Sequence, residues 1–311
     1  MARQRTTIGQ NKPKDIDSLP AELLEEIFHC CIEANTPWHS TKDTWRAERR
    51  SISTSITPLG VPKWITLTYV CRRWRRVALR NPLFWLHIPT TISLPWINTY
   101  LARSRNQSLT IDLDVVHIAP DAFSSLATAV APRLKALYLG RAGFDHSAIT
   151  LERYCAPLAS VPMPKLESLV LDISVPDCEL LDTLFASQAP RLRRLWLGPG
   201  VFVRPISTLL PNLRYLKLQT ALSVPELLSI VNQTPLLETL YIGDLLLSEY
   251  AFRDIGTLPR DARVNLAHLA HLTIKPSQET HPAMFVDVFE GLVLPATVHV
   301  DVSMTIEAPE E

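Results

Sequence analysis

Histidine and cysteine offer the most versatile side-chain chemistry, but their spacing in this chain supports none of it. Five of the 9 histidines lie at spacings that fit neither a catalytic triad nor a metal cage. They are His117, His146, His268, His271 and His281. Histidines of this kind are usually surface or partly buried side chains.

The cysteines and glycines lead to the same expectation. No CxxC pair occurs, and the 5 cysteines are scattered. They are Cys30, Cys31, Cys71, Cys155 and Cys178. GxSxG, HExxH and phosphate-binding glycine loops are missing from a sequence with only 9 glycines. We expect no enzyme, no catalytic residue, no metal site and no cofactor; a hydrolase is the disfavoured alternative.

Composition describes a neutral, globular chain. It has 311 residues, of which 47% are hydrophobic and 20% charged, and the formal net charge is +0. No overall field therefore attracts nucleic acid or an anionic membrane. Residues 1–15 lack the apolar core of a signal peptide, and we expect them to be disordered; residues 305–311 form an acidic tail. With no long apolar run and no disulfide framework, we expect a cytoplasmic or nuclear protein.

A Pro-x-Leu-x-x-Leu-x-Leu pattern repeats through residues 106–304. Clear copies begin at residues 132, 164, 190, 211 and 235, and one with Ala for Pro begins at 267. Weaker copies occupy 108–116 and 296–304. The Leu-x-Leu alternation predicts a short strand with two apolar side chains on one face.

Helical patterns separate several of these strands. They cover residues 121–130, 179–188, 225–233 and 283–291. Strand–helix–strand connections place consecutive strands parallel, and stacking the units buries a continuous core. We therefore expect an α/β fold.

The repeat resembles leucine-rich repeats, whose period is about 20–29 residues. The resemblance implies an arc with parallel strands inside and helices outside. The family's Asn or Cys after the last Leu is replaced here, so the arc should be irregular. The replacements are Ala142, Ser174, Gly200, Ala221, Leu245 and Ser277.

Side chains between the leucines of each strand must point away from the core. The row nearest the strand ends is Tyr138, Val170, Trp196, Lys217, Tyr241 and Thr273. The row two residues earlier is Ala136, Ser168, Arg194, Tyr215, Thr239 and His271. Exposed Trp, Tyr and Arg anchor interfaces, which suggests a target-binding surface. Its candidates are Tyr138, Arg194, Trp196, Tyr215, Lys217 and Tyr241. The alternatives are that a loop or the C-terminal tail covers them, or that the sheet face is passive.

Residues 16–88 predict two amphipathic helices joined by a polar insert at 35–62. Pro20 and Glu22 suit the start of the first helix. Its apolar face comprises Leu19, Leu23, Leu24, Ile27, Phe28 and Cys31. The second helix repeats the pattern with Leu67, Val70, Cys71, Trp74, Val77 and Ala78. Asn81-Pro82 ends it, and we expect residues 89–105 to be a linker.

The order of these apolar residues resembles an F-box: Leu19-Pro20-x-Glu22-Leu23, Ile27-Phe28, Val70-Cys71-x-x-Trp74 and Leu83-x-Trp85-x-x-Ile88. The insert is longer than the family's usual connection, which a surface loop tolerates. The resemblance implies a helical module that docks on a Skp-type adaptor and, through it, a cullin. The implied adaptor-binding residues are Leu19, Pro20, Leu23, Ile27, Phe28, Val70, Cys71, Trp74, Leu83 and Trp85. Two amphipathic helices packed on the downstream domain are the alternative.

The functional expectation is a substrate-recognition adaptor of a ubiquitin ligase that binds its target through the repeats. A scaffold with no link to ubiquitination is the alternative. The basic cluster Arg72, Arg73, Arg75, Arg76 and Arg80 admits a nuclear signal or a nucleic-acid patch. In a neutral chain we prefer a solvated helix face.

Overall fold

The computed structural model describes thirteen stretches of the chain. They are residues 16, 19–33, 63–89, 94–115, 118–140, 152–172, 178–180, 183–199, 201–205, 207–220, 222–245, 263–276 and 282–302. The predictions for residues 1–15, for the insert 35–62 and for the tail 305–311 lie outside them. The chain divides into a helical unit, residues 1–86 and 92–105, and a sheet unit, residues 87–91 and 106–311.

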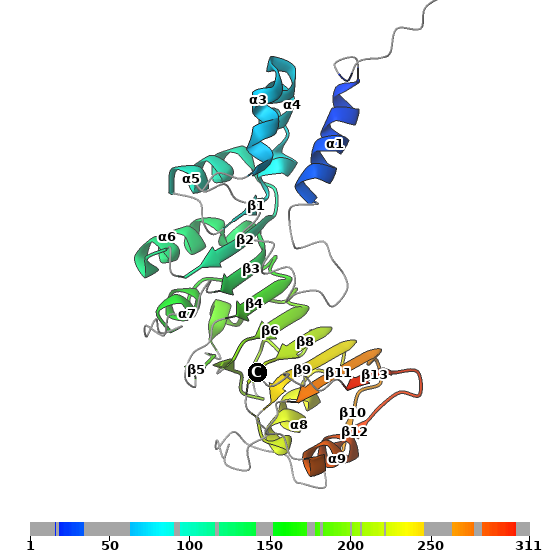
Figure 1. The fold of residues 1–311 in the computed structure, drawn as a ribbon. Coiled ribbons are helices and arrows are strands. Elements are labelled where there is room, and N and C mark those ends of the chain that lie inside the picture. The colour runs from blue at the N-terminus through cyan, green and yellow to red at the C-terminus, as the bar shows by residue number, and fades with distance from the viewer. Residues whose placement is uncertain are drawn as a thin grey trace, which may run out of the picture. The chain divides into compact units, whose positions relative to one another are not determined.

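The helical unit consists of short helices, shown in blue and cyan in Figure 1. They are α1 (Ala21–Glu33), η3 (Lys63–Thr66), α3 (Leu67–Val70), α4 (Arg72–Arg80), η4 (Pro82–Trp85) and α5 (Leu94–Arg103). The Leu24 N–H donates to the Pro20 carbonyl at 3.2 Å, so α1 begins directly after the proline. Asn81 ends α4 in an extended conformation, and its side chain accepts the Leu83 N–H that opens η4.

The second amphipathic segment is two helices rather than one. Cys71 is extended, with φ −154° and ψ 172°, and its sulfur accepts the Trp74 N–H at 3.4 Å as the N-cap of α4. Because the chain changes direction there, the expected continuous face is interrupted. Val70 is 60% exposed, whereas Trp74 and Ala78 face the core.

Aromatic rings form the core of the helical unit. The Phe28 centroid lies 4.9 Å from that of Trp74, which joins α1 to α4. Trp64 lies 4.9 Å from Trp85, and Trp85 lies 5.0 Å from Tyr100 of α5. The Trp64 indole N–H donates to the Tyr100 hydroxyl at 3.0 Å. Burial raises the pKa of the Tyr100 phenol, so this hydroxyl remains protonated.

The linker predicted for residues 89–105 is wrong in the structure. Residues 92–105 belong to the helical unit, and α5 occupies most of them. Ile97 and Tyr100, three positions apart along α5, are both buried. Arg103 donates to the Leu79 carbonyl at 3.1 Å and lies over Trp85 at 4.9 Å. Ile88, assigned to the helical module by its sequence motif, instead pairs in the sheet unit as part of β1.

The sheet unit contains a nine-stranded sheet whose strands are all parallel. In spatial order they are β1 (His87–Ile88), β2 (Leu109–Asp114), β3 (Leu134–Gly140), β4 (Ser168–Asp172), β6 (Arg194–Leu197), β8 (Tyr215–Leu218), β9 (Thr239–Leu245), β11 (His271–Pro276) and β13 (His299–Val302). Two small sheets pair β5 (Cys178–Glu179) with β7 (Val201–Phe202), and β10 (Val264–Asn265) with β12 (Leu292–Val293). The α/β class and the parallel strands are therefore confirmed.

The leucines of each copy occupy equivalent positions in neighbouring strands. Leu137, Leu169, Leu195, Leu216 and Leu240 form one continuous row by strand register. Each is at most 2% exposed. The next row, Leu139, Leu171, Leu197, Leu218 and Ile242, is entirely buried. Burial of two such rows is the physical reason for the Leu-x-Leu repeat.

The proline of each copy has a separate role in a tight turn before the strand. The Leu166 N–H donates to the Met163 carbonyl at 3.1 Å, and Leu192 donates to Ala189 at 3.1 Å. In these four-residue turns Pro164 and Pro190 take the second position, which proline favours because its φ is fixed near the required value. The third turn residues, Lys165 and Arg191, are exposed.

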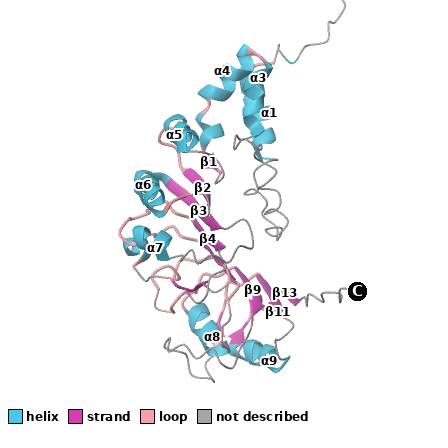
Figure 2. Cartoon of the chain, turned by 60° about the vertical axis from the view of Figure 1, so that its left-hand side comes forward, coloured by secondary structure: helices cyan, strands magenta, loops and turns pink. Residues whose placement is uncertain are grey.

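Helices connect the strands along one side of the sheet (Figure 2). They are α6 (Pro120–Val130), η5 (Ala131–Arg133), α7 (Glu152–Leu158), α8 (Val224–Asn232) and α9 (Pro282–Gly291). Three of the four helical predictions between strands thus match α6, α8 and α9.

The helix predicted at 179–188 is wrong. Glu179 lies in β5, and the Leu180 N–H donates to the Phe202 carbonyl at 2.8 Å. Further on, η6 (Leu184–Ser187) contains the left-handed residues Phe185 and Ala186, with φ of 58° and 51°. Such residues cost roughly 1–2 kcal/mol each. Complete burial of Leu184 and Phe185 offsets this cost.

Within the described residues, no helix combines the length and the apolar character needed to cross a membrane.

Candidate functional site

The ten adaptor-binding candidates separate into exposed and buried groups. Phe28, Trp74 and Trp85 are at most 9% exposed and form the core of the helical unit. Leu19 and Cys71 are half-buried, and the other five are exposed: Pro20, Leu23, Ile27, Val70 and Leu83. Only this last group exposes a large part of each side chain to solvent.

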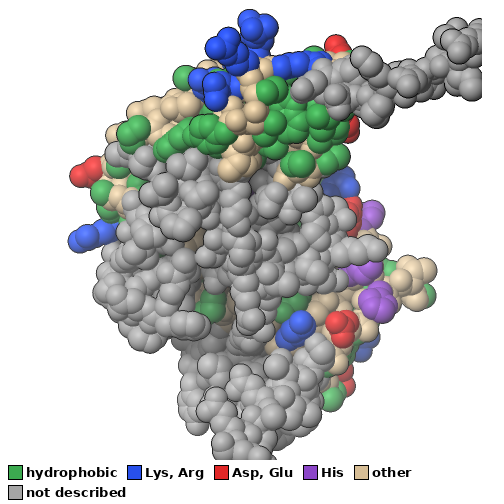
Figure 3. Space-filling view, turned by 45° about the horizontal axis from the view of Figure 1, so that its top comes forward, with side chains coloured by type: hydrophobic (Ala, Val, Ile, Leu, Met, Phe, Trp, Pro, Cys, Tyr) green, Lys and Arg blue, Asp and Glu red, His purple; other side chains and the backbone are tan. Residues whose placement is uncertain are grey.

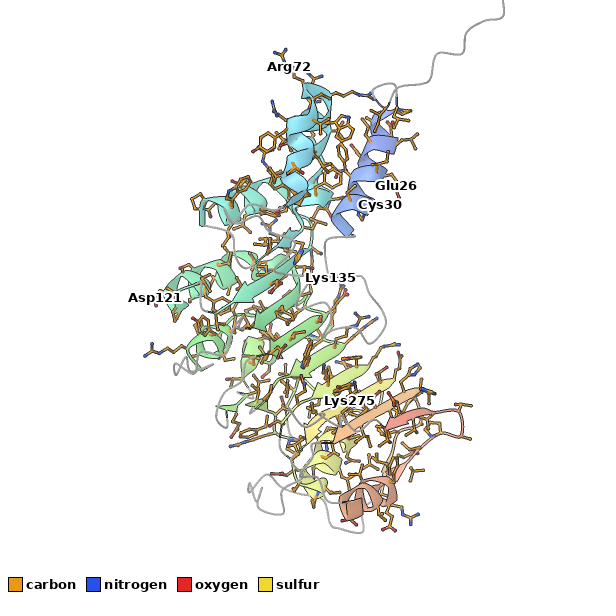
Figure 4. All side chains as sticks on the ribbon, in the orientation of Figure 1. Glu26, Cys30, Arg72, Asp121, Lys135 and Lys275 are labelled. Atoms are coloured by element: carbon orange, nitrogen blue, oxygen red, sulfur yellow. The ribbon has the colours of Figure 1, made fainter. Side chains whose placement is uncertain are left out.

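Helix α1 shows how the exposed group arises. Leu24 and Phe28, four residues apart, are completely buried, and they hold one stripe of the helix against the core. Leu23 and Ile27, one position earlier, remain 51% and 38% exposed. Glu26 and Cys30 are also exposed on α1 (Figure 4). The apolar face of α1 is thus wider than the surface it buries within the unit.

Helix α3 presents a second exposed apolar pair, Tyr69 and Val70, at 71% and 60% exposure. The buried Thr68 hydroxyl donates to the Ile65 carbonyl at 2.7 Å. Arg75 of α4 donates through Nε to the Thr68 carbonyl at 2.9 Å. These two hydrogen bonds hold α3 in place through Thr68, while the next two residues, Tyr69 and Val70, face solvent. Tyr69 was not among the sequence candidates. Its position next to the candidate Val70 is the sequence feature that could have pointed to it.

We define the apolar strip of the helical unit as Leu23, Ile27, Tyr69, Val70 and Leu83. All five are exposed large hydrophobic side chains. Figure 3 shows hydrophobic and basic side chains gathered together over this unit.

The arginine cluster has two roles in the structure. Arg73 donates to the Leu19 carbonyl, and Arg75 donates to that of Thr68, so both link backbone segments of the helical unit. Arg72, Arg76 and Arg80 are exposed on α4, with Arg72 labelled in Figure 4. Three of the five arginines thus lie on a solvated helix face, and the other two stabilise the fold.

The target-binding candidates form the two rows that strand alternation predicted. Register aligns Tyr138, Val170, Trp196, Lys217, Tyr241 and Thr273. It also aligns Ala136, Ser168, Arg194, Tyr215, Thr239 and His271. The rows are on the face opposite the leucines.

The expected exposure is wrong for Tyr138, Trp196 and Lys217, which are 5%, 4% and 4% exposed. One reason is that large side chains on parallel strands about 4.8 Å apart lean on one another. The Tyr138 and Trp196 centroids are 6.4 Å apart with the rings edge-to-face. The Lys217 nitrogen lies 3.8 Å from the Trp196 centroid and 4.5 Å from that of Tyr241.

Polar groups near the strand ends anchor this stack. The Trp196 indole N–H donates to Gln219 Oε1 at 2.8 Å, and the Tyr138 hydroxyl donates to Asp172 Oδ2 at 3.4 Å. At Gly243 a Cβ would lie only 2.5 Å from Cε1 of the Tyr241 ring. Gln219 and Asp172 were missed, although they lie two residues beyond Lys217 and Val170 on the same face of the sheet.

The accessible part of the predicted target surface is therefore smaller than expected. Arg194 is exposed, and its register neighbour Tyr215 is half-buried, as is Tyr241. Within the described stretches, no three His, Cys, Asp or Glu side chains are placed to hold a metal ion.

A scan against models of known protein families finds no match, and a search of curated proteins finds none either.

Proposed function

We propose that this chain is a substrate-recognition adaptor resembling the F-box subunit of a Skp–cullin–F-box ubiquitin ligase. The helical unit binds a Skp-type adaptor, and the sheet unit, an irregular leucine-rich-repeat-like arc, binds a target protein. The chain performs no chemistry of its own. It contributes proximity by holding the target near the partner enzymes.

The apolar strip carries this proposal. The helical unit already has a closed aromatic core around Phe28, Trp74 and Trp85. It nevertheless exposes five large apolar side chains from three elements: α1, α3 and η4. Exposing them to water is unfavourable by about 25 cal/mol per Å² of apolar surface, which a bound partner would recover. Four of the five also match the F-box motif: Leu23, Ile27, Val70 and Leu83.

A pull-down with a purified Skp-type adaptor tests the proposal. Leu23→Glu with Ile27→Glu should lose adaptor binding, because two central apolar contacts together supply on the order of 2 kcal/mol or more. Glutamate favours helix, so circular dichroism and the melting temperature should stay near wild type. The matched control is Val293→Glu with Val300→Glu, which alters exposed apolar residues of the sheet unit and should retain the adaptor.

The alternative is a repeat-based interaction scaffold with no link to ubiquitination. A wild-type chain that captures target proteins but never a Skp-type adaptor would support the scaffold.

A further inference from the structure

The turns that precede the strands carry an exposed cluster of positive charge. We define the basic rim as Arg191, Arg193 and Arg194, with Lys165 in the equivalent turn of the preceding copy; all four side chains are exposed. Arg191 is the third residue of the tight turn that the Leu192 N–H closes onto the Ala189 carbonyl. Arg193 follows directly before β6, and Arg194 is the first residue of that strand.

A backbone ladder holds this rim in a fixed arrangement. The N–H groups of Arg193 and Arg194 both donate to the Glu167 carbonyl, at 3.0 and 3.1 Å. The N–H groups of Arg214 and Tyr215 donate in turn to the Arg193 carbonyl, at 2.8 and 2.9 Å. Equivalent residues of adjacent copies are therefore spaced like neighbouring strands, about 4.8 Å apart.

The carboxylates beside the rim are engaged by other cations. Glu167 pairs with Lys135 at 3.5 Å, and Glu238 pairs with Arg214 at 2.5 Å. Neither pair includes Arg191, Arg193 or Arg194. These three arginines therefore concentrate positive charge at one edge of a chain whose formal net charge is +0.

Folding gains little from this arrangement. The three side chains are exposed, so they contribute little to the buried core. On the ladder Arg193 lies between Glu167 and Arg214, so attraction to one neighbour is opposed by repulsion from the other. The concentrated charge instead produces a local field that attracts anions.

We propose that the basic rim binds an acidic peptide segment of the partner held by the sheet unit; this rests on the target-binding part of the proposed function. Arginine forks bind planar carboxylates in a bidentate manner. Tyr215, half-buried and in register with Arg194, adds an apolar contact next to the charges. Nucleic-acid binding depends on many phosphate contacts along the backbone, whereas the rim offers four cations in two neighbouring turns, which favours a short peptide over nucleic acid.

Fluorescence anisotropy with the full chain tests this inference. The probes are a labelled Glu-rich peptide, a Gln-rich peptide of equal length, and a single-stranded oligonucleotide of the same charge as the acidic peptide. Wild type should bind the acidic peptide in preference to both others, with affinity that falls as salt rises. Equal binding of the Gln-rich peptide, or tighter binding of the oligonucleotide, would overturn the inference.

The chain supplies a control of matched charge. Arg191→Gln with Arg193→Gln and Arg194→Gln should lower acidic-peptide affinity by roughly tenfold or more. Arg72→Gln with Arg76→Gln and Arg80→Gln removes three exposed arginines of α4 and should leave that affinity unchanged. An equal loss in both triple variants would overturn the proposal. If the rim triple variant unfolds, Arg193→Gln alone should still weaken binding measurably, and an unchanged affinity would overturn the proposal.

A pull-down with the Skp-type adaptor on the same proteins separates this inference from the adaptor function. Loss of peptide binding with adaptor binding intact supports the rim. Peptide binding in a chain that never captures the adaptor also supports the rim and refutes only the adaptor part.

Discussion

The ammonium nitrogen of Lys217 lies 3.8 Å from the centroid of the Trp196 ring, and both side chains are almost completely buried. Trp196 also donates to Gln219 and meets Tyr138 edge-to-face. A cation over an indole face is stabilised by the ring's quadrupole, by about 2 kcal/mol or more when desolvated. Trp196 therefore stabilises the sheet unit, although it lies on the face of the sheet opposite the leucines.

Trp196→Ala should consequently destabilise the sheet unit by about 3–5 kcal/mol, because it removes a large buried aromatic side chain. Calorimetry should show a melting temperature lower by about ten degrees. Tyr215→Ala, on the same face but half-buried, should change the melting temperature much less. Similar melting temperatures for the two variants would contradict the structural role of Trp196.

The N-cap at Cys71 leads to a second prediction. Its sulfur is a weak acceptor for the Trp74 N–H, and a hydroxyl oxygen at an N-cap is a better one. Cys71→Ser should raise the free energy of unfolding relative to Cys71→Ala by about 1 kcal/mol in urea titrations. If serine gives no advantage over alanine, Cys71 does not cap α4.

Helix α8 carries a capping box that can be tested separately. The Ser223 hydroxyl accepts the Glu226 N–H at 3.4 Å, and the Glu226 carboxylate accepts the Ser223 N–H at 2.6 Å. Ser223→Ala should cost about 1 kcal/mol of stability, whereas Ser223→Asp should retain most of it. Chemical denaturation of both variants measures the difference. Equal losses would show that the hydroxyl's hydrogen bond is not the source of the effect.

Much of the sheet could be predicted because its repeat is governed by short-range chemistry. Proline fits the second position of each turn, and alternating leucines must share one face. Together they define the strands and their register, down to the weak copies that form β2 and β13.

Exposure was harder to predict because it depends on neighbours from other strands. Alternation places Trp196 opposite the leucines, but it does not show that Lys217 and Tyr138 pack against its ring. The break at Cys71 and the left-handed turn at Phe185 were missed for a related reason. Tertiary contacts there outweigh local helical periodicity, and apolar spacing alone contains no information on those contacts.

Hydrogen–deuterium exchange with and without a purified Skp-type adaptor tests whether the helical unit is the adaptor-binding site. We expect the adaptor to slow amide exchange in α1 and in residues 67–86, which carry the apolar strip, and to leave exchange in β6 and β8 unchanged. A chain that forms no complex with the adaptor, or a complex that protects the sheet unit while α1 and α3 exchange as before, would contradict it.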